Sequence, residues 1–187
     1  MKPTLDSIKT YHPVAIALHW LMLLGLACAT VMALIMVDMP GITPTKLRLF
    51  NYHKWLGVAL WCLVVVRLLW RWIVAAPPLP AHMKLWEVRV AQAMHFALYI
   101  LMFSIPVAGY CYSLVAGFPV VWFGVLELPV LMAPNPELKP VLKSLHSTLG
   151  LGLWCLVGLH ALAGLKHWLV NKDGVMQRML PFLKQKK

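Results

Sequence analysis

Two histidines in the last long apolar stretch, His146 and His160, have a spacing that suits redox chemistry. They are 14 positions apart, which in an α-helix corresponds to a rotation of about 1400° and a rise of about 21 Å. Because this rotation is within about 40° of four full turns, both imidazoles project from one helix face, near opposite ends. Imidazole is a common metal ligand. The spacing predicts ligands for two porphyrin irons stacked across a membrane, between which electrons hop.

Each iron then needs a second ligand at the same depth. We call the side that carries both chain termini inner and the opposite side outer. His53 lies at the outer end of the second apolar stretch, level with His146, and His19 lies near the inner end of the first, level with His160. These depths predict the pairs His19 with His160 and His53 with His146. His95 is the rival ligand for the inner iron, and otherwise lies behind the ligands or faces a quinone.

Small and cationic neighbours support this interpretation. Gly57, Gly150 and Gly164 each follow one of the four histidines by one helical turn, where a missing side chain leaves room for a flat macrocycle. Small residues also favour helix packing in membranes, which is the alternative explanation. Arg67 shares the face of His53 at the depth of the inner cofactor, so it is a candidate partner for a heme propionate. The alternative is that its charge reaches the inner membrane surface.

The cysteine pattern restricts the type of cofactor. No cysteine belongs to a CxxCH motif, so covalent c-type attachment is not indicated. Zinc sites prefer tetrahedral clusters of closely spaced ligands, whereas these histidines pair between helices. We therefore expect two non-covalent b-type hemes, each with two histidine ligands and no open iron position. The cysteines all fall in apolar stretches and are not expected to form disulfides: Cys28, Cys62, Cys111 and Cys155.

The composition shows what must position these histidines. Hydrophobic residues make up 61% of the 187 residues and charged residues only 12%, against roughly 45–50% hydrophobic residues in a soluble domain. The mean hydropathy is +0.75. Such content excludes intrinsic disorder, and a net charge of +11 does not indicate a nucleic-acid partner, because long stretches carry no charge. The sequence predicts one integral membrane domain in contact with lipid.

Four transmembrane helices are predicted, and together they form an all-α bundle. An even number of spans places both termini on one side. Segments on that side carry 12 Lys and Arg, and the opposite loops carry 5, so the positive-inside rule puts both termini in the cytoplasm. The loops are too short for a second domain and suggest no obligate protein partner. The expected spans are residues 14–37, 53–74, 90–114 and 144–170.

Four segments together resemble the bacterial cytochrome b561 family across nearly the whole chain. They are AIALHWLMLLG, NYHKWLGVALWCLVVVRLLWR, AQAMHFALYILMFSIPVAGY and LHSTLGLGLWCLVGLHALAGLKHW, and the ending KDGVMQRMLP also fits. The resemblance implies a four-helix diheme protein of the bacterial inner membrane. In the wider group the fourth helix supplies one ligand to each heme, which matches His146 and His160.

The family includes superoxide oxidase, which passes electrons from superoxide on the outer side to ubiquinone near the inner side. The resemblance therefore implies an oxidoreductase with superoxide as the donor. Cations above the outer heme would attract this anion, although outer acidic residues dilute the effect. The expected steering residues are Lys46, Arg48 and Lys54, with Lys139 and Lys143 nearby.

A quinone site is expected beyond the inner iron. His167 follows His160 by seven residues, on nearly the same face and about 10 Å nearer the cytoplasm. It is the best candidate for a quinone contact, with Trp168 and Arg71 as weaker ones. The alternative is that His167 and Trp168 belong to an aromatic belt at the membrane surface.

Two other functions stay open. The chain could be a cytochrome b subunit that receives electrons from a separate dehydrogenase or hydrogenase. The apolar segment 115–134, with Trp122 and Phe123, could then be its docking surface. A bundle without redox function would leave the histidine spacing to chance.

Overall fold

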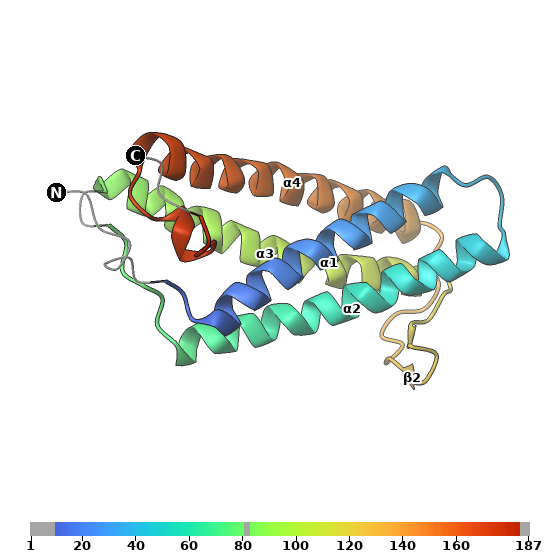
Figure 1. The fold of residues 1–187 in the computed structure, drawn as a ribbon. Helices are drawn as coiled ribbons and strands as arrows, with labels where there is room; N and C mark the ends of the chain where they lie inside the picture. The colour runs from blue at the N-terminus through green and yellow to red at the C-terminus, as the bar shows by residue number, and fades with distance from the viewer. Residues whose placement is uncertain (1–9, 81–82, 184–187) are drawn as a thin grey trace.

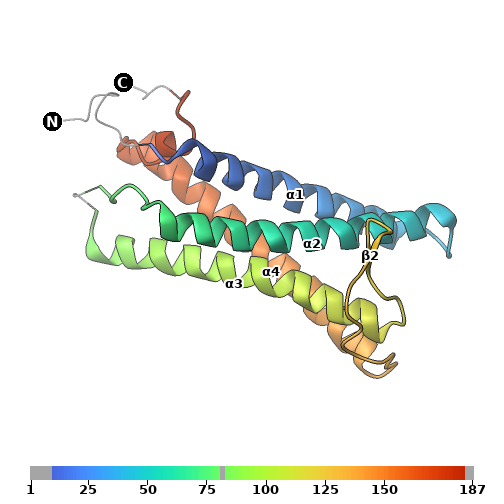
Figure 2. The same ribbon diagram turned by 90° about the horizontal axis from the view of Figure 1, so that it is seen from below.

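The computed structural model describes residues 10–80 and 83–183, and its architecture is a bundle of four long helices (Figure 1). Helix α1 packs along α2 and α3 packs along α4, while α2 also contacts α3 (Figure 2). The all-α prediction is confirmed apart from one short hairpin. The four helices are α1 (Pro13–Asp38), α2 (Pro44–Ile73), α3 (Leu85–Val115) and α4 (Leu138–Lys166).

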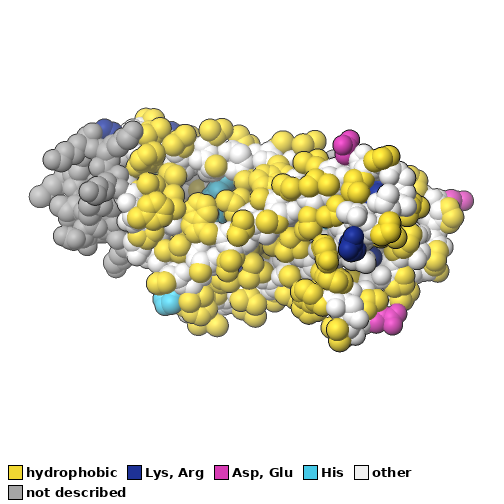
Figure 3. Space-filling view, turned by 45° about the vertical axis from the view of Figure 1, so that its right-hand side comes forward, with side chains coloured by type: hydrophobic (Ala, Val, Ile, Leu, Met, Phe, Trp, Pro, Cys, Tyr) yellow, Lys and Arg dark blue, Asp and Glu magenta, His cyan; other side chains and the backbone are white. Residues whose placement is uncertain are grey.

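All four helices are long and apolar enough to span a membrane. Between 6% and 28% of each spanning window is buried within the protein, so most of the apolar surface faces outward. Figure 3 shows hydrophobic side chains along the flank of the bundle, with charged groups mainly near its ends. Since an exposed apolar surface of this extent suits lipid and not water, the predicted four-helix membrane fold is confirmed.

Helices α2 and α4 begin earlier than the sequence analysis predicted. Pro44 starts α2, and the Thr43 hydroxyl accepts a hydrogen bond from the backbone N–H of Lys46 at 3.2 Å. Before α4, the Asn135 side chain accepts from two free backbone N–H groups. These caps stabilise helical turns whose charged residues lie outside the hydrocarbon region. Hydropathy locates only the apolar part of such helices.

Helix α3 ends at Val115, one residue beyond the expected span, and Gly117 follows with a φ of +82° that suits glycine. The chain then forms a short hairpin that the sequence analysis missed, in which β1 (Val121–Trp122) pairs with β2 (Leu126–Glu127). The hairpin is fastened to α2 by two indole groups. Trp55 Nε1 donates to the Val121 carbonyl at 2.7 Å, and Trp122 Nε1 donates to the Trp55 carbonyl at 3.0 Å.

Beyond α4 the chain turns back across the inner end of the bundle. Helix α4 continues into the π-helix η2 (His167–Asn171), and a 3-10 helix η3 (Met176–Arg178) follows. Trp20 Nε1 on α1 donates to the Met179 carbonyl at 3.1 Å, and the backbone N–H of Tyr11 donates to the Arg178 carbonyl at 3.2 Å. Both ends of the described chain therefore lie together at one end of the bundle.

Candidate functional site

The outer histidine pair connects α2 with α4. The ring centroids of His53 and His146 lie 6.1 Å apart, and both side chains are half-buried. Nδ1 of His53 lies 2.9 Å from the Ala29 carbonyl oxygen, and Nδ1 of His146 lies 2.9 Å from that of Ile105. Since a carbonyl oxygen can only accept, Nδ1 is the protonated nitrogen in each ring. Nε2 is then free to bind a metal.

The inner histidines form a cluster of three. His19 on α1 and His160 on α4 have ring centroids 6.2 Å apart. His95 on α3 lies closer, with its centroid 5.2 Å from that of His160. Its Nδ1 lies 2.8 Å from the carbonyl oxygen of Ala91, one turn earlier in α3. The structure thus brings together the expected inner pair and its rival.

The separations within the two pairs fit a six-coordinate heme iron. A metal–imidazole bond is about 2 Å long, and the centre of a five-membered ring with bonds of about 1.33 Å lies about 1.1 Å from each atom. Two imidazoles on opposite sides of one iron should therefore have centroids roughly 6.2 Å apart. His53–His146 and His19–His160 meet this distance. The His95–His160 separation of 5.2 Å is too short for it.

Other metal sites fit less well. Within residues 10–80 and 83–183, no group of three or more His, Cys, Asp or Glu side chains is arranged to hold one metal ion. The expected zinc arrangement has four such ligands. The four cysteines are free. Each end of the bundle thus offers a pair of imidazoles, which suits a heme iron with two histidine ligands.

The glycines next to the histidines differ in what surrounds them. A Cβ added to Gly57 or to Gly150 would meet nothing within 4 Å, so the space beside both helices at the outer pair is open. At Gly164 an added Cβ would lie 3.9 Å from the sulfur of Met176. Gly109 on α3 was not predicted from the sequence; an added Cβ there would lie 2.8 Å from Cε1 of His146. Its only sequence signal is that it lies four residues after Ile105, the partner of His146.

A further hydrogen bond joins α1 and α4 between the two histidine levels. Trp154 Nε1 donates to the Thr30 hydroxyl at 2.9 Å, and that hydroxyl donates to the Leu26 carbonyl. Since α1 carries His19 and α4 carries both His146 and His160, this contact helps to fix the distance between the helices that hold the inner pair.

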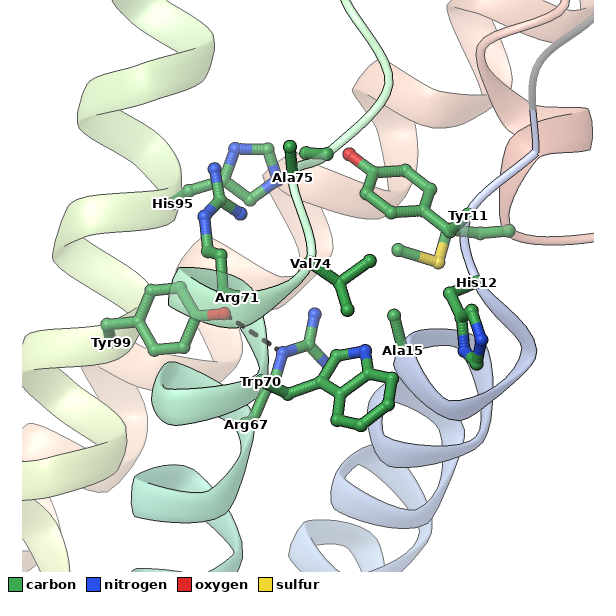
Figure 4. Close-up of a pocket in the computed structure, with 12 residues that line it drawn as sticks. Tyr11, His12, Ala15, Arg67, Trp70, Arg71, Val74, Ala75, His95 and Tyr99 are labelled. Carbon is green, nitrogen blue, oxygen red and sulfur yellow. Dashed lines mark hydrogen bonds between the residues drawn. The ribbon is translucent and has the colours of Figure 1, made fainter.

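Arg67 lies beside the inner cluster, as the sequence predicted. Its Nε donates to the Tyr99 hydroxyl at 3.0 Å, and its guanidinium carbon lies 5.9 Å from the centre of the Tyr99 ring. Arg67 is half-buried and lines a cavity together with His95 (Figure 4). In this position the guanidinium of Arg67 can contact an anionic group near the inner histidines. It does not extend to the membrane surface, which was the alternative expectation.

At the inner end, His167 is held by a carboxylate that the sequence analysis did not assign. Nδ1 of His167 lies 2.6 Å from an oxygen of Asp173, whose side chain is 1% exposed. Burial alone would raise the pKa of Asp173, but hydrogen bonds from His167 and Val175 and the charge of His167 hold the pKa below its ordinary 3.8. Trp168 is half-buried beside His167 in η2. The close spacing of Asp173 to His167 was the available sequence signal.

The three predicted steering cations at the outer end differ in their exposure to solvent. The Lys46 ammonium is half-buried and donates to the Met39 carbonyl at 2.7 Å. Arg48 is exposed, and its guanidinium donates a hydrogen bond to the Thr45 hydroxyl at 3.4 Å. Lys54 is half-buried beside His53. Figure 3 shows basic side chains at this end, with acidic ones apart from them near the edges of the view.

The sequence is similar to known proteins over almost its whole length. The family model of prokaryotic cytochrome b561 matches residues 10–182. Cytochrome b561 homolog 2 of Escherichia coli (strain K12) is 31% identical over 173 residues, which cover 92% of each chain. Cytochrome b561 homolog 1 of the same organism is 28% identical over 174 residues, covering 93% of this chain and 98% of the relative.

A third relative carries a more specific name. The probable superoxide oxidase CybB of Yersinia pestis is 28% identical over 180 residues, covering 92% of this chain and 97% of its own length. These matches agree with the four apolar helices and with the two histidine pairs at opposite ends of the bundle. This chain belongs to the prokaryotic cytochrome b561 family, whose members are bacterial membrane proteins that transfer electrons and bind b-type heme.

Proposed function

We propose that the chain carries electrons across the bacterial inner membrane through two b-type hemes. His53 and His146 would bind the outer heme iron, and His19 and His160 the inner one. The observation that carries this proposal is the near-identical separation of the two pairs, 6.1 Å and 6.2 Å, at opposite ends of the bundle. Two imidazoles per iron leave no position for a substrate, so the function is electron transfer and not ligand binding.

The protein orients the four histidine side chains that would bind the hemes. Heme provides a one-electron redox couple when it is bound. The carbonyl groups of Ala29 and Ile105 fix the tautomer and direction of His53 and His146, and such hydrogen bonds raise the basicity of a ligand. The bond between Trp154 and Thr30 holds α4 against α1 between the two levels. The histidines are therefore positioned before electrons move.

We propose superoxide as the electron donor on the outer side. One named relative is a probable superoxide oxidase, and the outer end of this chain carries the exposed cation Arg48 together with Lys54 and Lys46. Two superoxide anions would each lose one electron and leave as oxygen. One quinone would gain both electrons and two protons and leave as quinol. The cations bring the anion to the outer end, since electrostatic attraction raises encounter rates.

We propose ubiquinone as the acceptor on the inner side, near His167 and Trp168. Asp173 accepts a hydrogen bond from Nδ1 of His167, so Nε2 is the ring nitrogen left to face a quinone. This pair can hold one of the protons that the quinone takes up from the cytoplasm, the side on which the positive-inside rule places both termini.

A spectrum and an activity assay test the proposal. The purified protein should show a reduced-minus-oxidised b-type spectrum, with two hemes per chain in a pyridine hemochrome assay. A superoxide generator should then drive quinone reduction, and added superoxide dismutase should abolish it. Absence of the b-type spectrum would refute the electron-transfer function, whereas heme without superoxide-dependent reduction would refute the donor alone.

The second candidate is an electron-transfer subunit for a separate dehydrogenase or hydrogenase. The observation that favours it is the hairpin at the outer end, where Phe123 and Val125 are 60% and 88% exposed. An exposed apolar hairpin could be covered by a partner or by lipid. Association with a dehydrogenase in gently solubilised membranes, together with heme reduction by its substrate, would support this function.

A further inference from the structure

A cavity at the inner end of the bundle lies beside the inner histidine cluster, and Arg67, Arg71 and His95 are among the residues that line it. Its volume is about 50 Å³, more than the roughly 10–15 Å³ that a cavity needs to hold one water molecule. A small polar group such as a carboxylate fits in this space. The walls come from residues 11–15 around the start of α1, from the end of α2 and the segment after it, from α3, and from Met179 in the tail (Figure 4).

The lining of the cavity includes hydrogen-bond donors and cations beside apolar residues. Figure 4 shows the guanidinium groups of Arg67 and Arg71 on α2, opposite His95 and Tyr99 on α3. No Asp or Glu belongs to the lining. Within residues 10–80 and 83–183, the ion pairs join Lys166 to Glu87 and His167 to Asp173. Neither guanidinium is therefore neutralised by a carboxylate in the described part of the chain.

One buried donor in this wall lacks an acceptor. The indole Nε1 of Trp70 is inaccessible to solvent and has no hydrogen-bond partner among residues 10–80 and 83–183. Leaving a buried donor unsatisfied is unfavourable, so its presence indicates an acceptor outside the described residues. Trp70 precedes Arg71 and lies one turn after Arg67, and all three line the same cavity.

The position of the cavity identifies the acceptor. His95 lines the cavity, and its ring lies 5.2 Å from that of His160, the proposed inner ligand. Because α2 ends at Ile73, the free carbonyl groups of its last turn lie close by and repel an anion. The two arginines offset this repulsion. An anion that projects from the inner heme would meet both cations and the free indole N–H.

We propose that this cavity is a carboxylate site for the inner heme, in which Arg71 and Trp70 join Arg67 in binding the propionate groups. The inference rests on the proposed heme function and adds two residues to it. Arg71, earlier a weak candidate for the quinone, then stabilises the inner heme. A cation beside a propionate favours the reduced heme, because reduction adds a negative charge.

The test measures the midpoint potentials of both hemes in the purified holoprotein by spectroelectrochemical titration. Arg71→Gln should lower only the inner potential, with a roughly tenfold shift toward the oxidised form, equivalent to about 59 mV for one electron. Trp70→Phe removes the indole N–H but keeps an aromatic ring, and it should lower the inner potential less. Arg71→Lys keeps the positive charge and should retain most of the wild-type potential. The outer heme in the same molecule reports whether the fold is intact.

Arg89→Gln is the matched control, because Arg89 is an exposed cation at the same end of the bundle that does not line the cavity. It should leave both potentials unchanged. The proposal is overturned if Arg89→Gln shifts the inner potential as much as Arg71→Gln does. It is also overturned if Arg71→Gln removes co-purified anionic phospholipid and leaves both potentials unchanged, since a lipid phosphate would then be the occupant. A wild-type protein without heme would instead refute the proposed function.

Discussion

Gly109 on α3 directly faces the imidazole of His146 on α4. A Cβ at this glycine would lie 2.8 Å from Cε1 and 3.0 Å from Nδ1 of the ring, which is closer than van der Waals contact allows. Nδ1 of His146 also needs the Ile105 carbonyl, four residues before Gly109 on the same helix. Helix α3 therefore sets the position of a ligand that it does not itself carry.

We predict that Gly109→Ala displaces His146 and removes most of the outer heme, while the inner heme is retained. The ring cannot move away without losing its 2.9 Å contact with the Ile105 carbonyl, and a small misplacement of a metal ligand is costly. A pyridine hemochrome assay should fall from two hemes per chain toward one.

Gly152→Ala is the control for this substitution. An added Cβ there would lie 4.0 Å from Leu101, an ordinary contact, so both hemes should be retained. Equal heme content in the Gly109→Ala and wild-type proteins would show that the ring of His146 tolerates the shift and that α3 has no role in its placement.

We predict that alanine substitutions at the four ligands divide into two groups. His53→Ala and His146→Ala should lose the same heme, and His19→Ala and His160→Ala the other one. The reason is that each pair has the separation expected for two imidazoles on one iron. Heme content and the reduced spectrum of each variant are the measurements.

His95→Ala is the decisive comparison at the inner site. Its ring lies 5.2 Å from that of His160, which is too short for two axial ligands, so this variant should keep both hemes. If His95→Ala lost the inner heme while His19→Ala kept it, the inner pair would have to be reassigned to His95 and His160.

The fold and the paired histidines were predictable because both follow from simple periodicities. Apolar stretches of about 20 residues indicate membrane spans, and helical geometry places residues 14 positions apart on one face. The sequence therefore placed His146 and His160 on α4 at two depths. It could not place His95 relative to the inner pair, because that distance depends on how α3 packs against α4.

The residues that were not predicted from the sequence owe their roles to contacts between distant segments. The sequence alone does not show which segments pack together. Gly109 is one of several glycines in apolar stretches, and only the approach of α4 distinguishes it. Asp173 lies in a polar exit segment, where a solvated charge is the ordinary expectation. Its role becomes visible only because the chain beyond α4 turns back and buries its carboxylate against His167.

We predict that Asp173→Asn lowers stability at neutral pH and that the difference from wild type disappears in acid. The folded protein holds the pKa of Asp173 below its ordinary 3.8, so the unfolded chain binds the proton more readily. The stabilisation is present above pH 3.8 and is lost as pH falls through the lower folded pKa. Losing a hydrogen bond to a charged group costs about 1.5–3 kcal/mol, which thermal unfolding at several pH values can measure.

The same variant tests the proposed quinone site. Asp173→Asn should slow quinone reduction while the heme spectra stay unchanged, since the carboxylate acts through His167 and not on a heme. Glu87→Gln is a suitable comparison, because Glu87 pairs with Lys166 at the same end of the bundle at 3.4 Å. An Asp173→Asn protein with wild-type quinone kinetics would exclude this pair from the acceptor site.

We predict that Arg48→Gln reduces the rate of superoxide capture at low ionic strength but not at high ionic strength. Arg48 is the exposed member of the predicted steering residues, whereas the Lys46 ammonium is bound to the Met39 carbonyl. A unit charge at roughly 10 Å in water contributes about 0.4 kcal/mol, or about a twofold rate effect. Salt at about 0.1 M screens interactions over this distance. Arg89→Gln changes the same charge at the inner end and should leave the rate unchanged, so equal effects of both variants would indicate net charge and not steering at the outer heme.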